Sequence, residues 1–92
     1  MSTTADILQD IFELEVHAPF QVEIGGVMHR LQYLVRGKGG GKALVVDAEQ
    51  GRLAPIAQAL EGLGYGVECF DLDTGDFEEF IEVLDEWEIP HA

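Results

Sequence analysis

The chain is predicted to fold as one α+β domain, residues 1–92, with a mixed four-stranded sheet, and three observations favour this class. Its residues are 47% hydrophobic, which is enough for one core, and a length of 92 residues is too short for two domains. Apolar residues alternate on both sides of Gly25-Gly26, a pattern typical of an antiparallel hairpin. A helical stripe separates the apolar runs 43–46 and 67–72, so these two strands should run parallel.

The first half of the chain is expected to supply one helix and a long hairpin. Residues 3–14 carry an i, i+1, i+4, i+5 apolar stripe, which indicates a helix. Residues 20–24 form the first hairpin strand, and the second runs from Val27 to about Arg36. With a two-residue turn at Gly25-Gly26, the expected pairs are Ile24–Val27, Val22–His29 and Phe20–Leu31.

The second half should complete the order α-β-β-β-α-β-α. The run 43–46 is a short central strand, and a helix over 52–63 follows it, with Pro55 tolerated in its first turn. Residues 67–72 form the fourth strand, and a last helix spans 77–87. The sheet is therefore an antiparallel meander plus one parallel strand, and we expect the helices mainly on one face.

Charge is strongly segregated along the sequence. All five lysines and arginines lie between Arg30 and Arg52, whereas residues 1–29 carry five carboxylates and residues 53–92 carry eleven, for a net charge of −13. Such acidity argues against direct binding of nucleic acids or anionic membranes, which require Lys and Arg. The sequence has no apolar run of 18 residues and no signal-peptide pattern, and its one cysteine, Cys69, fits a reducing compartment. A cytoplasmic location is expected.

The final helix carries the clearest functional signal, an acidic outer face. Two of its i,i+4 pairs join like charges, and three of its acids lie near the C-terminal end, where the helix dipole disfavours anions. Such a run is either a solvated face or a docking surface for a basic partner. The residues of this predicted surface are Glu78, Glu79, Glu82, Asp85, Glu86 and Glu88.

Two loops are weaker candidates. GKGGGK, residues 37–42, is not a Walker motif, because Ala43 follows Lys42 and no helix begins there; Lys38 and Lys42 remain possible contacts. Residues 71–82 resemble a calcium loop in outline, with Asp71, Asp73, Asp76 and Glu82 as weak candidate ligands. However, Gly75 and Asp76 occupy positions five and six in the reverse of the required order. We therefore assign no metal and no cofactor.

No catalytic motif stands out. His29 falls on the inward face of the hairpin and Cys69 is expected in the core, and nothing in the sequence places a Cys69–His29–Asp71 triad together.

The segment 43–71, with an acid at the end of its first strand and a helix ending in Gly-Tyr-Gly-Val, resembles the opening β-α-β unit of a response-regulator receiver domain. Too few residues follow to supply the rest of that fold, so the resemblance assigns no site.

Four functions remain open at this point. The leading one is a non-enzymatic interaction module that binds a basic protein through the acidic helix, with a homodimer as a further expectation. The second is a nucleic-acid mimic that inhibits a DNA-binding enzyme. The third is a halophilic-type domain. The fourth is a small-ligand or divalent-cation site at residues 71–82, or an enzyme that uses the 37–42 loop.

Overall fold

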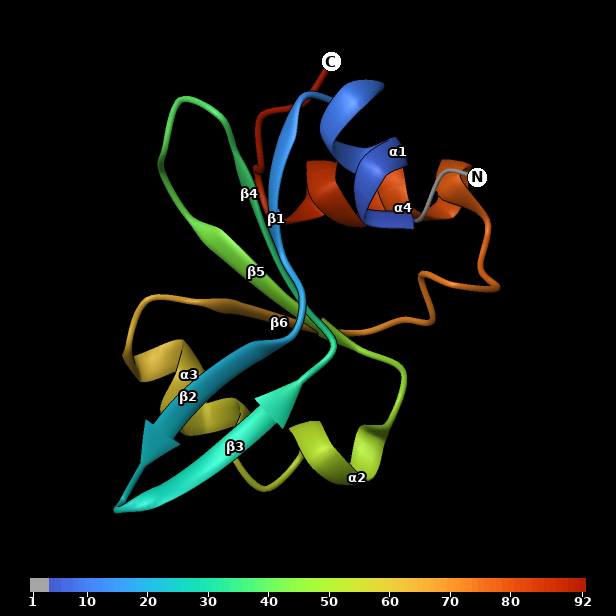
Figure 1. Ribbon diagram of the computed structural model, residues 1–92. Helices are drawn as coiled ribbons and strands as arrows, with labels where there is room; N and C mark the ends of the chain where they lie inside the picture. The colour runs from blue at the N-terminus through green and yellow to red at the C-terminus, as the bar shows by residue number, and fades with distance from the viewer. Residues whose placement is uncertain (1–3) are drawn as a thin grey trace.

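The computed structural model describes residues 4–92, which form four helices and six strands in an α+β domain (Figure 1). The mixed sheet with one parallel pair confirms the predicted fold class. In chain order the elements are α1 (Thr4–Asp10), β1 (Leu14–His17), β2 (Phe20–Ile24), β3 (Val27–Leu31), β4 (Tyr33–Gly37), β5 (Ala43–Asp47), α2 (Gln50–Leu53), α3 (Ala57–Gly62), β6 (Gly66–Cys69) and α4 (Phe77–Glu86).

The strands form a four-stranded sheet in the order β1-β4-β5-β6 and a separate two-stranded sheet, β2-β3. Only β5 and β6 run parallel, as expected for strands connected through helices. The hairpin has the predicted register, with Ile24 opposite Val27 and Phe20 opposite Leu31. Gly25 and Gly26 both have positive φ, the conformation that a two-residue type I′ turn requires.

The second hairpin strand does not continue to Arg36 as predicted, because it is interrupted at Gln32. There the backbone nitrogen donates to the Asp47 carboxylate at 3.1 Å, and the Gln32 amide oxygen accepts from the nitrogen of Ala48 at 2.9 Å. These bonds fix the point at which the chain leaves the hairpin as β3 and enters the main sheet as β4. The alternation that puts His29 on the inward face of the hairpin predicts the same face for Val27, but Val27 is 56% exposed because the hairpin tip extends beyond the core.

The N-terminal helix is shorter than predicted, and a strand replaces its second half. Glu13 has a φ of 53°, which is incompatible with helix continuation, and Leu14 then begins β1. β1 pairs antiparallel with β4, from Leu14 opposite Gly37 to His17 opposite Leu34. Strand β1 therefore occupies one edge of the sheet, next to α1.

The helix expected over residues 52–63 is divided into α2 and α3. It begins earlier than predicted, at Gln50, so Pro55 falls at its end and not in its first turn. Proline has no N–H to donate within a helix, and Ile56 leaves the helical conformation with φ −120° and ψ 0°. The chain then re-enters a helix at Ala57.

Side chains of β5 alternate between two cores on opposite faces of the sheet. Leu44 and Val46 pack in a cluster with residues of α1 and α4, whereas Val45 packs with α2, α3 and the β2-β3 hairpin. The helices therefore divide between both faces and do not lie mainly on one (Figure 1). The short α2 and α3 cover the second face only together with the hairpin.

Helix α4 is the longest and is well anchored. The Asp76 carboxylate accepts a hydrogen bond from the nitrogen of Glu78 at 2.8 Å and caps the first turn. Phe80 and Leu84 are fully buried in the first core. No helix within residues 4–92 has both the length and the apolar character needed to cross a membrane.

Candidate functional site

The six acids predicted to form a surface on the last helix are all exposed in the structure. Five of them lie on the side of α4 opposite its buried residues, and Glu88 follows the C-cap of the helix, Trp87. We call Glu78, Glu79, Glu82, Asp85, Glu86 and Glu88 the acidic face. Within residues 4–92, one ion pair reaches this surface: His91 Nε2 lies 2.8 Å from Asp85 Oδ1. The other five carboxylates have no cationic partner in that part of the chain.

The acidic face is held by a helix whose other side is packed firmly. The rings of Phe70 and Phe80 lie 5.6 Å apart in the core beneath α4. At the end of the helix the Trp87 indole donates from Nε1 to Glu68 Oε1 at 3.2 Å, which ties α4 to β6. A partner would therefore meet carboxylates on a preorganised scaffold, which lowers the entropy lost on binding.

Two of the arginines form ion pairs away from the acidic face, and one lysine lies beside the end of α4. Arg36 pairs with Glu15 at 2.6 Å, and Arg52 pairs with the buried Asp47 at 3.1 Å. Lys42, one of the two predicted loop contacts, places its Nζ 4.8 Å from the centre of the Trp87 ring, a cation–π contact beside the end of α4.

The other predicted loop contact, Lys38, lies beside a separate shallow cleft. Glu13 and His91 line the same cleft. Neither lysine of the 37–42 loop forms an ion pair with the acidic face among the described residues.

The acids of the 71–82 segment have structural roles in the turn that leads to α4. Asp71 accepts hydrogen bonds from the nitrogens of Asp73 and Thr74 and from the Thr74 hydroxyl, and this hydroxyl bond is the main cause that lowers the pKa of the Asp71 carboxyl. Asp73 accepts from the Tyr33 hydroxyl at 2.6 Å, and Asp76 caps α4. Across residues 4–92, no three His, Cys, Asp or Glu side chains converge in a geometry that could hold a metal ion.

Cys69, His29 and Asp71 do not form a catalytic triad in the structure. No hydrogen bond joins these three side chains within the described part of the chain; the Cys69 thiol instead lies 3.6 Å from the carbonyl oxygen of Ala48. Cys69 is exposed, which corrects the expectation of a core position, because β6 is an edge strand and ends at this residue. His29 is half-buried at the margin of the second core.

Sequence reasoning missed the central role of Asp47, the buried charged residue at the end of β5. Its carboxylate accepts from the backbone nitrogens of Gln32 and Glu49 and from the Arg52 guanidinium. An acid directly after the apolar run 43–46 was the available signal. Glu49 and Arg52 follow Asp47 by two and five residues, whereas Gln32 precedes it by fifteen and could not be assigned as a partner from spacing.

Comparison of the chain with protein-family models, curated proteins and solved structures gives no match.

Proposed function

We propose that this protein is a non-enzymatic interaction module that binds a basic protein partner through the acidic face of α4. The observation that supports this function is the combination of six exposed carboxylates with a helix whose opposite side is buried in the core. The Lys and Arg side chains that form ion pairs within residues 4–92 do so with Glu15 and Asp47, away from α4. The face is thus left available to cations from another molecule.

The arrangement works against the stability of the isolated helix. Glu78 and Glu82, and Glu82 and Glu86, are like-charge neighbours one turn apart, and each pair costs a few tenths of a kcal/mol. The acids near the end of α4 also meet the negative end of the helix dipole. A basic partner would remove both penalties, so the unfavourable charges of the free protein would contribute to affinity.

Charge of this kind acts mainly on association. A field from clustered carboxylates steers a basic surface toward α4 and raises the rate of association at low salt, with a loss as salt screens the charges over about 10 Å at 0.1 M. The proposed complex should therefore form fast and weaken with increasing ionic strength. We further propose a cytoplasmic location, since the free, exposed Cys69 thiol suits a reducing compartment.

The test compares the protein with a charge-neutralised variant in a pull-down from the source lysate at low salt, followed by a salt step. The variant combines Glu78→Gln, Glu82→Gln and Glu86→Gln. Its matched control combines Asp10→Gln, Glu23→Gln and Glu61→Gln, which removes the same charge from exposed positions outside α4. Chemical denaturation should show the α4 variant to be as stable as the parent or slightly more stable, since it relieves like-charge pairs.

Support for the proposal is one stoichiometric basic protein that the parent and the control variant retain and the α4 variant loses. Equal retention by all three proteins would reject the acidic face as the binding surface. If duplex DNA competes for the captured protein, the module acts as a nucleic-acid mimic, the alternative function within the same binding mode.

A further inference from the structure

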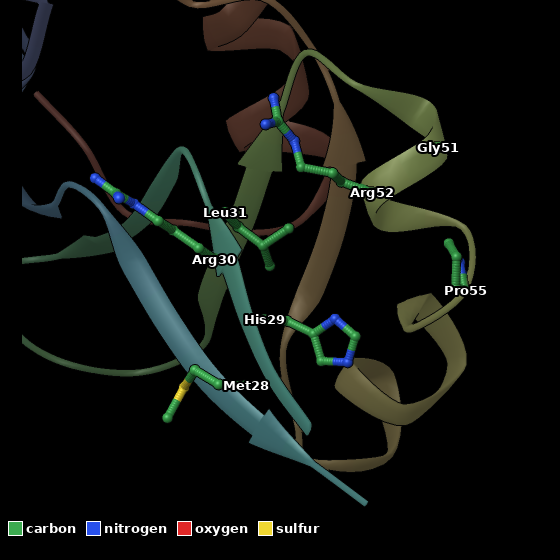
Figure 2. A pocket seen from close by; sticks show the side chains of 7 residues that line it. All are labelled: Met28, His29, Arg30, Leu31, Gly51, Arg52 and Pro55. Carbon is green, nitrogen blue, oxygen red and sulfur yellow. The ribbon is translucent and has the colours of Figure 1, made fainter. Parts of the chain in front are cut away.

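A cleft of about 320 Å³ lies between strand β3 and the segment that contains α2, and Figure 2 shows the side chains that line it. Both elements lie at the end of the molecule that carries the hairpin (Figure 1). Four consecutive residues of β3, 28–31, line one side, and Gly51, Arg52 and Pro55 line the other. Successive residues of a strand point to opposite faces, so a run of four can line one cleft only if the cleft follows the edge of the strand. Figure 2 agrees, since the His29 ring extends toward the side of Pro55 whereas Arg30 leaves β3 in the other direction.

The register of the hairpin identifies which backbone groups face this cleft. Ile24 and Val27 flank a two-residue turn and form a hydrogen-bonded pair, so the next such pair is Val22 with His29. Met28 lies between these pairs and Arg30 beyond them, and the N–H and C=O groups of both point away from β2. The two-stranded sheet ends at β3, and within residues 4–92 these groups have no backbone partner.

The side chains around this edge are cationic and apolar. The Arg52 side chain lines the cleft and is half-exposed, and its Nε and Nη2 are oriented by the Asp47 carboxylate at 3.3 and 3.1 Å. The His29 side chain makes no ion pair or hydrogen bond among the described residues, and Met28 is 61% exposed. Although the chain carries 18 carboxylates, none of the residues that line the cleft is acidic.

We propose that this cleft binds an extended peptide segment of a partner protein, with an acidic side chain directed at Arg52 and His29. The segment would add a third strand to the β2-β3 sheet, with its backbone paired to Met28 and Arg30. Strand addition of this kind takes its affinity from main-chain hydrogen bonds and its specificity from pockets that receive alternate side chains. The carboxylate is selected by charge: the whole protein repels anions, but the walls of this cleft do not.

The experiment titrates ¹⁵N-labelled protein with a capped hexapeptide of alternating valine and glutamate and follows backbone amide shifts. The control peptide replaces glutamate with lysine. A protein of charge −13 attracts the lysine peptide non-specifically, so a preference for glutamate at this site reports the cleft. We expect saturable shifts at Met28 and Arg30, and binding about fivefold tighter for glutamate than for lysine, the effect of one partly exposed ion pair.

Two proline variants test the role of the strand edge. Met28→Pro removes an N–H that faces the cleft and should abolish binding of the glutamate peptide. Gln21→Pro is the matched control, because Gln21 also occupies a non-hydrogen-bonded position but faces the outer edge of β2. Amide shifts of α4 and the main sheet establish that both variants are folded.

Each remaining outcome is decisive. Equal or tighter binding of the lysine peptide, shifts confined to other surfaces, or loss of binding in both proline variants or in neither would overturn the proposal. Shifts of Met28 and Arg30 that depend on protein concentration without peptide would show that a second copy occupies the edge, and would also overturn it. The triple α4 variant should bind the glutamate peptide like the parent, so failure of this inference and failure of the proposed function are separable.

Discussion

Oδ2 of the buried Asp47 carboxylate lies 3.1 Å from the backbone nitrogen of Gln32, the residue between β3 and β4. The other oxygen of the same carboxylate accepts from Glu49 N at 2.7 Å and from the Arg52 guanidinium. One carboxylate therefore accepts from the backbone at two points, where the hairpin separates from the sheet and where α2 begins. It also holds the Arg52 side chain that lines one wall of the cleft.

Replacement of Asp47 should be the most damaging polar substitution in the domain. Asp47→Ala leaves two part-buried backbone donors and the half-exposed Arg52 side chain without their shared acceptor, and we expect a loss of about 3 kcal/mol in the free energy of unfolding. Asp47→Asn keeps the volume and one acceptor and should lose less. Urea denaturation measures both, with Glu49→Ala as the exposed control, expected within about 0.5 kcal/mol of the parent. A small loss for Asp47→Ala would show that this network does not stabilise the fold.

Tyr33 should titrate well above an ordinary tyrosine. Burial, followed by its hydrogen bond to Asp73, raises the pKa of the Tyr33 phenol from 10.0 to about 12. Because the folded-state value is the higher one, this contribution to stability is complete below pH 10 and is lost as pH rises from 10 to 12.

Ultraviolet absorbance near 295 nm measures this ionisation. The parent should show one phenol with the raised pKa, and Tyr33→Phe should remove that transition. The same variant should lose about 1 kcal/mol of stability at neutral pH with its hydrogen bond. A titration at the ordinary pKa in the folded parent would contradict the contact with Asp73.

The parts of the fold that sequence predicted correctly are those set by local chemistry. Gly25-Gly26 favours the two-residue turn that pairs Ile24 with Val27, and the apolar run at 43–46 indicates a strand covered on both faces. Helix α4 follows from its apolar stripe and the Asp76 cap. The exposure of the acidic face was predictable for the same reason, since it is the complement of that stripe.

The errors occur where a long-range contact decides the structure. The interruption at Gln32 depends on Asp47, fifteen residues away, and β1 exists through its pairing with β4. Pro55 divided a helix because the helix began two residues earlier than expected. The cleft has no local signature either, because its two walls come from β3 and α2 and meet only in the folded chain.

His91 should keep its proton to a higher pH than a free histidine. Its Nδ1 lies 2.9 Å from the Ala92 carbonyl oxygen and its Nε2 lies 2.8 Å from Asp85, and both contacts raise the pKa of the imidazole, the first more than the second. The resulting stabilisation is complete below pH 6.5 and is lost as pH rises through the folded-state pKa. Histidine proton NMR should show that Asp85→Asn lowers this pKa. Glu86→Gln, which removes a neighbouring acid without a contact to His91, should change it much less, and equal effects would contradict a direct pair.

Glu88 follows α4 and its C-cap, Trp87, and adopts a backbone conformation that does not suit its residue type. Glu88 has a φ of 58°, a left-handed conformation that costs a side-chain-bearing residue about 1 kcal/mol and that glycine adopts freely. The next nitrogen, of Ile89, donates to the Leu84 carbonyl at 2.8 Å, so this conformation closes the helix.

Glu88→Gly should therefore raise the free energy of unfolding by about 1 kcal/mol, with a further small gain from removing an anion at the negative end of the dipole. Glu88→Gln removes only the charge and should gain a few tenths of a kcal/mol, so the difference between the two variants in urea denaturation isolates the backbone term. If Glu88→Gly proves less stable than Glu88→Gln, the left-handed turn is not under strain and Glu88 contributes to the end of α4 by another contact.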